Sequence, residues 1–291
     1  ASAYLTQNGY QVEVFEKNDR AGGLMIYGIP NFKLDKKIVE RRTEWLTDSG
    51  VVFNLNTEVG KNISFQDLEK DYDAILIATG VYKARQLDIV TSTVNNSIPA
   101  LDFLIESNRT GLGDSPSKNK YLTAKDKHVV VIGGGDTAMD CVRTAIRQQA
   151  KEVTCLYRRN KENMPGSARE VLNAEQEGIK FNWLSVPSKI ISDSATATSM
   201  TYKVATLGEV DESGRRKPID TGVEKQIKSD LIIQALGFEP EDLNHNFKTN
   251  IELTSWKTVK VDFKKFQTSN PKIFAAGDIV RGASLVVWAI H

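Results

Sequence analysis

The fold is decided by the stretch His128-Val-Val-Val-Ile-Gly133-Gly-Gly135-Asp-Thr-Ala138. Four β-branched residues precede the glycines, as in a buried parallel strand, and apolar residues at helical spacing follow. Gly133 permits a tight turn, Gly135 lets the backbone approach a pyrophosphate, and Ala138 is small enough for a helix to pack on the strand. The stretch therefore predicts a strand, a dinucleotide-binding turn and a helix over residues 136–150.

The end of the next predicted strand selects the nucleotide. It reads Cys155-Leu-Tyr-Arg158-Arg159, whereas an NAD site places Asp or Glu there to bind the adenosine ribose. Two guanidinium groups suit the 2′-phosphate of NADP, because they can hold it by charge-assisted hydrogen bonds. The alternative is that both arginines are solvated surface charges. This part of the chain predicts an NADP site.

An earlier part of the chain repeats the same order with the opposite ribose chemistry. The strand Gln11–Phe15 ends at Glu16, the carboxylate expected beside an unphosphorylated ribose, and Asp73–Gly80 corresponds to Asp230–Gly237. The opening strand and glycine loop of this copy would lie before Ala1, and we expect the sequence to be a fragment at both ends. Opposite ribose preferences fit one FAD and one NADPH, between which hydride passes.

These runs predict an α/β fold with two Rossmann-like dinucleotide-binding domains and a small antiparallel β meander. The NADP-binding domain, residues 123–248, is expected to be inserted into the FAD-binding domain, residues 1–122 and 249–291. Residues 110–127 are rich in Gly, Ser, Pro and Asn and are expected to connect the two domains. The meander is expected over residues 199–228, where glycines separate β-prone stretches.

Composition argues against several other classes of function. Lys and Arg total 38 against 37 Asp and Glu, a net charge of +1, so nothing indicates a nucleic-acid partner or an anionic membrane surface. No apolar run reaches the roughly 20 residues of a membrane span, and we expect a cytoplasmic protein. Cys141 and Cys155 form no C-x-x-C pair and are expected to be packing residues. His128, His245 and His291 show no metal-ligand spacing. Hydride transfer between bound cofactors needs no dedicated acid or base, so no catalytic residue is predicted.

The segment Gly22-Gly-Leu-Met-Ile-Tyr-Gly-Ile-Pro-Asn-Phe-Lys-Leu-Asp35 resembles the small (beta) subunit of glutamate synthase. The resemblance covers nearly the whole chain and continues at Gly133–Asp140, Tyr157–Arg159, Met164–Gly166, Phe274–Asp278 and Arg281–Ile290. The first and last blocks are specific to that family, while the middle ones occur in a wider group of flavoproteins with two dinucleotide-binding domains. The resemblance implies that NADPH reduces FAD and that electrons leave for the large (alpha) subunit, which makes glutamate from glutamine and 2-oxoglutarate. Iron–sulfur clusters would carry the electrons, with cluster ligands expected only in an N-terminal region outside this sequence.

The resemblance also implies roles for individual residues. On the FAD side these are Glu16, Gly23, Leu24, Lys33, Gly80, Gly277 and Asp278. On the NADP side they are Gly133, Gly135, Asp136, Thr137, Arg158, Arg159 and Gly237. Glu16 would bind the FAD ribose, Lys33 would lie close to the flavin nucleotide, and Asp278 would hydrogen-bond its ribityl or pyrophosphate region. The strand-ending Gly80 and Gly237 could instead serve turn geometry alone.

Other functions stay open at this point. The electron-input module of dihydropyrimidine dehydrogenase, or of a related iron–sulfur oxidoreductase, shares the two-nucleotide plan. A nucleotide-binding redox sensor without turnover would need no further residues. An enzyme like thioredoxin reductase would need a cysteine pair beside the flavin, which Cys141 and Cys155 do not form.

Overall fold

The computed structural model describes residues 1–89, 94–210 and 216–290, so His291 lies outside the described residues. The chain divides into two compact units. Unit 1 comprises residues 1–26, 37–85 and 237–291, and unit 2 comprises residues 27–36 and 86–236. Along the chain, the segments of unit 2 lie between segments of unit 1. The predicted α/β fold is confirmed. None of the helices in the described part of the chain is long and apolar enough to cross a membrane.

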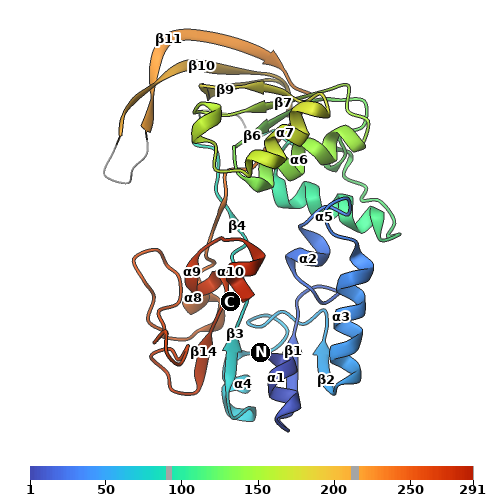
Figure 1. The fold of residues 1–291 in the computed structure, drawn as a ribbon, viewed down its shortest axis with the longest axis vertical. Helices are drawn as coiled ribbons and strands as arrows, with labels where there is room; N and C mark the ends of the chain where they lie inside the picture. The colour runs from blue at the N-terminus through green and yellow to red at the C-terminus, as the bar shows by residue number, and fades with distance from the viewer. Residues whose placement is uncertain (90–93, 211–215, 291) are drawn as a thin grey trace. The chain divides into compact units, whose positions relative to one another are not determined.

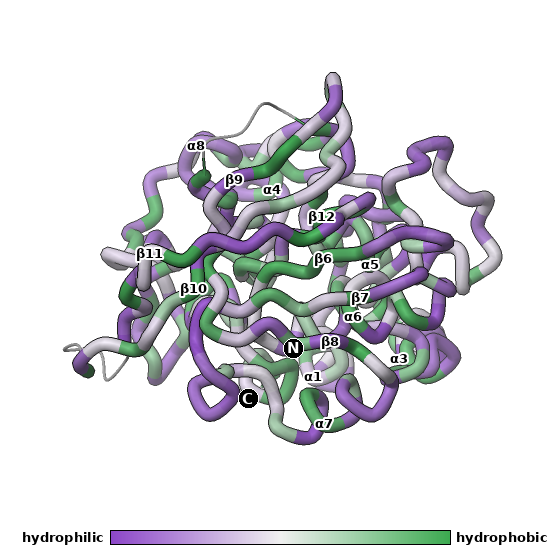
Figure 2. Tube along the Cα trace, turned by 90° about the horizontal axis from the view of Figure 1, so that it is seen from above, coloured by the Kyte–Doolittle hydropathy of each residue, from purple (hydrophilic) through white to green (hydrophobic). Residues whose placement is uncertain are grey.

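Unit 2 is built on a five-stranded parallel sheet with the strand order β5-β12-β6-β7-β8. The strands are β5 (Ser97–Pro99), β6 (His128–Ile132), β7 (Glu152–Leu156), β8 (Lys180–Asn182) and β12 (Leu231–Gln234). Both faces of the three central strands are covered, which is why β6 and β12 are almost unbroken apolar runs. Figure 2 shows this hydrophobic stretch along β6.

Helices cover one face of the parallel sheet (Figure 1). They are α5 (Ala100–Gly111), α6 (Asp136–Arg147) and α7 (Ala168–Gln176), with short 3-10 turns at Lys120–Leu122 and Lys161–Asn163. Val129 and Val131 of β6 point into the same buried cluster as Ala138, Met139 and Val142 of α6. This packing explains the helical spacing of apolar residues after the glycine turn.

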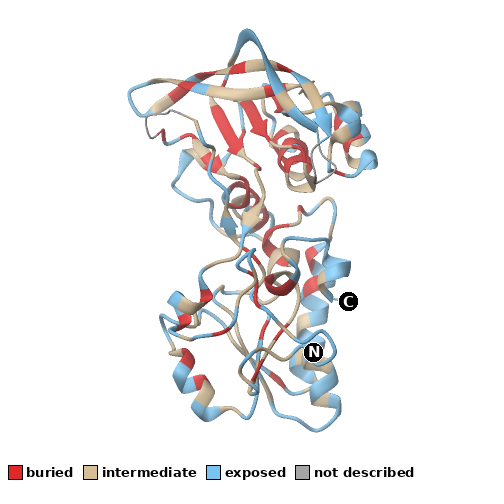
Figure 3. Cartoon of the chain, turned by 90° about the vertical axis from the view of Figure 1, so that its left-hand side faces the viewer, coloured by how far each residue is buried: buried red, intermediate tan, exposed pale blue. Residues whose placement is uncertain are grey.

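A second sheet covers the other face. Its antiparallel strands β9 (Ser185–Asp193), β10 (Thr196–Val210) and β11 (Arg216–Lys228) lie in the order β11-β10-β9. Met200 and Tyr202 of β10 pack with Val130 and Ile132 of β6. The predicted meander is confirmed, although it begins at Ser185 and its residues 211–215 are not described. Figure 3 shows buried segments on both strands and helices, whereas β11 is largely exposed.

Unit 1 contains three separate strand pairs among its described residues. β1 (Val12–Phe15) pairs with β2 (Val51–Asn54) and β3 (Ile75–Ile77) with β14 (Ile273–Ala275), both parallel, whereas β4 (Lys83–Ala84) pairs antiparallel with β13 (Phe238–Glu239). Its helices are α1 (Ser2–Gln7), α2 (Leu24–Tyr27), α3 (Lys36–Asp48), α4 (Phe65–Asp71), α8 (Leu243–Phe247), α9 (Asp278–Arg281) and α10 (Val286–Ile290). Helices α2 and α3 flank the stretch 27–36 that belongs to unit 2. The core of unit 1 gathers Phe65, Ile77, Ile273 and Ile279.

The limits of the two units differ from the predicted domain limits. Residues 110–127 lie inside unit 2, where Ala124 belongs to the same buried core as α5 and α6 and Tyr121 and Leu122 pack against it. The interpretation of 110–127 as an interdomain connection is therefore wrong. Residues 237–248 belong to unit 1, where β13 pairs with β4. The limits of the two nucleotide-binding domains stay a prediction.

Candidate functional site

The turn between β6 and α6 has the geometry that a dinucleotide site requires. Gly133 has φ +144°, and a Cβ there would lie 2.1 Å from the carbonyl oxygen of Ala235. Only glycine fits such a position without displacing backbone. A Cβ on Gly134 would lie 2.3 Å from the ring of Tyr157. By contrast, nothing lies within 4 Å of a Cβ placed on Gly135, so the turn opens there.

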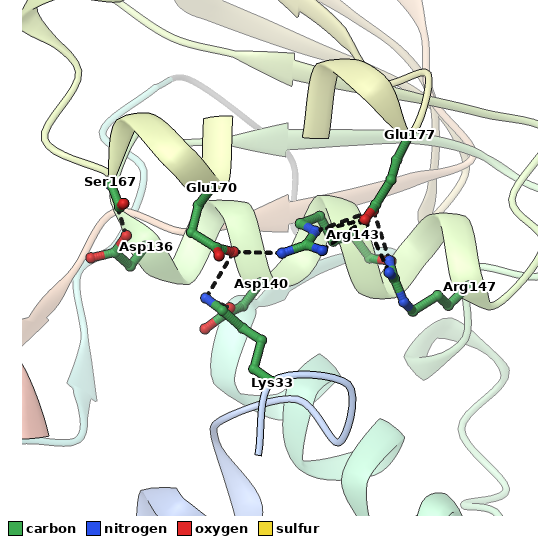
Figure 4. A network of polar contacts seen from close by, with 8 residues as sticks. All are labelled: Lys33, Asp136, Asp140, Arg143, Arg147, Ser167, Glu170 and Glu177. Carbon is green, nitrogen blue, oxygen red and sulfur yellow. Dashed lines mark hydrogen bonds and ion pairs between the residues drawn. The ribbon is translucent and has the colours of Figure 1, made fainter. Parts of the chain in front are cut away.

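Helix α6 begins at this opening. Gly135 is its N-cap and supplies no side-chain hydrogen bond. The first N–H groups of a helix have no intrahelical acceptor, and the helix dipole adds positive charge, so phosphates bind there. The Asp136 carboxylate is turned toward α7, where Oδ1 accepts a hydrogen bond of 2.9 Å from the backbone N–H of Ser167 (Figure 4). The open turn and the first N–H groups of α6 together form a cradle that suits a pyrophosphate. The roles of Gly135, Asp136 and Thr137 remain predictions.

The block Met164-Pro-Gly166 packs on the turn. The backbone N–H of Gly166 donates a 2.9 Å hydrogen bond to the carbonyl of Gly134. The Tyr157 hydroxyl donates to the carbonyl of Asn163 at 2.9 Å. Together these contacts hold Gly134 against the Tyr157 ring, which gives the block a structural role that its sequence did not indicate.

The two predicted 2′-phosphate ligands follow β7, the strand next to β6. Arg158 is exposed, and Arg159 is partly exposed. Arg159 Nε donates a 3.0 Å hydrogen bond to the carbonyl oxygen of Arg216, the first residue of β11. Because β6 and β7 are parallel neighbours, both arginines lie at the same edge of the sheet as the glycine turn. Their position fits the adenosine end of a nucleotide bound at that turn.

In unit 1, Glu16 follows β1 as predicted. Its Oε1 accepts hydrogen bonds from the backbone N–H of Asn18 at 2.9 Å and from the Asn18 side-chain amide at 2.7 Å. The carboxylate is therefore held in one orientation at a half-buried position. Its other oxygen makes no hydrogen bond to a residue that the structure describes, and so could accept from a ribose hydroxyl.

Tyr82 lies where several predicted FAD-side residues meet, although sequence reasoning did not single it out. A Cβ on Gly80 would lie 3.1 Å from the Tyr82 ring, and one on Gly23 would lie 3.3 Å from its hydroxyl. Burial, reinforced by the charges of Glu16 and Asp278, raises the pKa of Tyr82 to about 12. Gly23 and Gly80 thus lie beside the Tyr82 ring, and the charges of Glu16 and Asp278 reach its hydroxyl. No local sequence signal marks Tyr82, which simply follows a strand-ending glycine.

The remaining strand-end residues of unit 1 are placed as follows. Asp278 begins α9, and its Oδ1 accepts a 2.6 Å hydrogen bond from the hydroxyl of Ser284. Gly277 precedes it with φ +79°, and Gly237 has φ +89° with open space at its Cβ position. Leu24 begins α2 and is half-buried. Their roles toward cofactors stay predictions.

Lys33 belongs to unit 2, where its side chain contacts one residue of helix α6 and one of helix α7. Its Nζ is 2.7 Å from Asp140 Oδ1 and 3.0 Å from Glu170 Oε2 (Figure 4). Burial pulls the pKa of Lys33 down, but the two carboxylates outweigh it, so that the pKa lies above its ordinary value. These contacts do not support the predicted place of Lys33 beside the flavin nucleotide.

Comparison with known proteins identifies the family. Residues 1–291 match the family model described as pyridine nucleotide-disulphide oxidoreductase. The chain belongs to this pyridine nucleotide-disulphide oxidoreductase family. Membership confirms the prediction of a pyridine nucleotide-dependent oxidoreductase and supports FAD and NADP as cofactors.

Two relatives make the resemblance more specific. The chain is 49% identical over 295 residues to the glutamate synthase [NADPH] small chain of Azospirillum brasilense, covering 100% of this chain but 61% of the relative. It is 51% identical over 293 residues to a putative glutamate synthase [NADPH] small chain of Cereibacter sphaeroides, covering 100% and 70%. The resemblance to glutamate synthase small subunits is therefore confirmed. The chain spans only about three fifths of the first relative's length, since 61% of it is covered.

A solved structure shows the same fold. Mycobacterium tuberculosis FprA, in complex with NADPH, matches with a TM-score of 0.80 at 18% sequence identity, covering 98% of this chain and 77% of FprA. At this identity the likeness concerns the fold alone.

In this member of the pyridine nucleotide-disulphide oxidoreductase family, neither cysteine is available for disulphide chemistry. Cys141 on α6 and Cys155 on β7 are fully buried free thiols. Burial raises the pKa of Cys155 to about 12 and that of Cys141 well above its ordinary value, so both stay protonated at neutral pH. They are packing residues, as expected. Within the described ranges, no group of three or more His, Cys, Asp or Glu side chains is placed to hold a metal ion.

Proposed function

We propose that this chain is the NADPH-oxidising flavoprotein part of a cytoplasmic glutamate synthase small subunit. It would pass electrons from NADPH through FAD, and through iron–sulfur clusters outside residues 1–291, to a large (alpha) subunit that makes glutamate from glutamine and 2-oxoglutarate. One observation carries the NADPH assignment: a glycine turn open at Gly135 stands beside a strand that ends in Arg158 and Arg159. The assignment of a large-subunit partner is supported by the relatives, which are named as small chains of glutamate synthase.

On the NADPH side, the chain's residues bind and orient. The uncapped N-terminus of α6 would hold the pyrophosphate, because its N–H groups and dipole favour negative charge. Arg158 and Arg159 would hold the 2′-phosphate, which NADH lacks. Together they would fix the adenosine half of the nucleotide and so orient the nicotinamide half.

On the FAD side, Glu16 would accept hydrogen bonds from the adenosine ribose, with its carboxylate already held by Asn18. Asp278 would hydrogen-bond the ribityl or pyrophosphate region, held in place by Ser284. The chemistry that bound FAD would supply is the conversion of a two-electron hydride transfer into successive one-electron transfers. No side chain of this chain is required as an acid or base for hydride transfer.

An anaerobic visible spectrum of the natural full-length polypeptide tests the proposal. We expect a flavin band that bleaches on adding NADPH and much more slowly on adding NADH at the same concentration. A full-length protein that binds no flavin, or a bound flavin that neither nucleotide reduces, would contradict it.

The same preparation tests the partner. Mixed with a glutamate synthase large subunit, it should support NADPH-dependent glutamate formation from glutamine and 2-oxoglutarate. Rapid flavin reduction without any glutamate formation would favour the input module of another iron–sulfur oxidoreductase.

A further inference from the structure

Tyr82 occupies a distinctive position in unit 1. It follows Gly80, which lies three residues beyond the end of β3, and its half-buried ring packs against that glycine. Its hydroxyl faces Gly23, in the loop after β1. Lys17 places its Nζ 4.8 Å from the centre of the same ring. The loop after β1 and the segment that follows β3 therefore meet at one aromatic side chain.

The hydroxyl of Tyr82 differs from those of Tyr157 and Tyr202, two buried tyrosines of unit 2. Tyr157 donates to a backbone carbonyl, and the Tyr202 hydroxyl accepts from the side-chain amide of Asn182 at 3.3 Å. The Tyr82 hydroxyl makes no hydrogen bond with any residue in the described ranges. The hydroxyl is therefore free to bond a ligand that reaches this half-buried position.

The surroundings of Tyr82 favour the protonated hydroxyl. Burial, and after it the charges of Glu16, Asp278 and Glu241, raises the pKa of Tyr82, so the hydroxyl keeps its proton at neutral pH and can donate a hydrogen bond. Glu16 and Asp278 are the residues expected to hold FAD. Its acceptor would therefore be a phosphate or hydroxyl oxygen of the flavin nucleotide, near the ammonium group of Lys17.

We propose that Tyr82 is a contact residue of the flavin nucleotide. Its ring forms a wall of the FAD site between Gly23 and Gly80, and its hydroxyl donates a hydrogen bond to the bound nucleotide. The inference rests on the proposed FAD site and adds to that site a residue that sequence reasoning missed. A Cβ would lie 3.3 Å from the hydroxyl at position 23 and 3.1 Å from the ring at position 80, and the positive φ at both positions also favours glycine.

The test measures the dissociation constant of FAD with flavin-free, full-length protein. Tyr82→Phe removes only the hydroxyl and should raise the constant about fivefold, as for one lost hydrogen bond. Tyr82→Leu also removes the aromatic ring and should raise it more than about tenfold. Tyr10→Phe and Tyr10→Leu are the matched controls, since Tyr10 is an exposed tyrosine of the same unit.

Two further readouts separate binding from folding. The dissociation constant of NADP+ and the melting temperature of flavin-free protein should stay unchanged in Tyr82→Phe. Wild-type FAD affinity in both Tyr82 variants would overturn the inference while leaving the proposed function intact. If Tyr82→Leu does not fold, the Phe variant decides alone, because it keeps the ring. A wild-type protein that binds no FAD would overturn the proposed function itself.

Discussion

Lys33 Nζ and Asp140 Oδ1 lie 2.7 Å apart although 107 residues separate them in the chain. Phe32 strengthens the same attachment, with its ring under the guanidinium groups of Arg143 at 4.8 Å and Arg147 at 3.9 Å. These contacts place residues 27–36 on α6 and α7, and so in the unit that carries the predicted NADP turn. The segment most specific to glutamate synthase small subunits is therefore partly built into unit 2.

Removing the ammonium group should destabilise unit 2. In Lys33→Met, Asp140 loses its partner, and burial already raises the pKa of that carboxyl. We expect the free energy of unfolding to fall by about 1–3 kcal/mol, because the pair is partly buried. Urea titration of the single variants, Asp140→Asn and the double variant measures the coupling.

The FAD dissociation constant of the same variants tests the competing role of Lys33. Weaker FAD binding in Lys33→Met, with normal binding in Asp140→Asn, would restore the interpretation of Lys33 as a flavin-nucleotide ligand. Unchanged FAD binding in both would leave it as a residue that positions the 27–36 segment.

Replacing Arg158 and Arg159 by serine should abolish the preference for NADPH over NADH. Each lost charge-assisted contact to the 2′-phosphate should raise the KM for NADPH about 10-fold or more, while NADH is little affected. Rapid-mixing measurements of flavin reduction by each nucleotide give the ratio. Arg169→Ser, another exposed arginine of unit 2, is the control. An unchanged ratio in the double variant would mean that the two arginines are only solvated charges.

Two alanine substitutions in the glycine turn should separate folding from binding. Gly133→Ala forces a Cβ to within 2.1 Å of the Ala235 carbonyl at a positive φ, and should cost about 2 kcal/mol or more of stability. Gly135→Ala meets no atom within 4 Å and has φ −90°, so the protein should fold normally. Its NADP+ affinity should nevertheless fall, because the methyl group projects into the open cradle. Calorimetry with and without NADP+ measures the stability and the NADP+ affinity of both variants. Equal stability and equal affinity in the two would contradict a nucleotide site at this turn.

Acid stability should depend on Glu177. Its Oε2 lies 2.7 Å from Arg147 Nη1 and its Oε1 2.7 Å from Arg143 Nη2 (Figure 4), and these arginines lower its pKa from 4.5 to about 2. A carboxylate whose pKa is lower in the folded than in the unfolded state stabilises the fold at any pH above the unfolded-state pKa. This contribution is lost as the pH falls toward 2. Wild-type stability should therefore drop more steeply than that of Glu177→Gln between about pH 4.5 and 2. Glu175→Gln, which breaks a more exposed pair with Lys161, should follow the wild-type curve.

Much of unit 2 could be predicted from the chain itself. The β-branched run before Gly133 and the helical spacing after it both report burial over a dozen neighbouring residues, and local periodicity captures burial of this kind. The helix was expected over residues 136–150 and ends at Arg147, and β7 ends at Leu156, two residues before Arg158. Ends of elements depend on capping and fraying, which single residues decide.

The amino-acid sequence by itself determined the strand–turn–helix at Gly133, the arginine-ended strand of the predicted NADP site and the carboxylate at Glu16. In each case, neighbouring residues carry both the structure and the chemistry. Only the tertiary structure decided that Lys33 pairs with Asp140 and that Tyr82 stands among the predicted flavin residues. These contacts join residues far apart in the chain, and their partners are chosen by how whole elements pack, which no local pattern records.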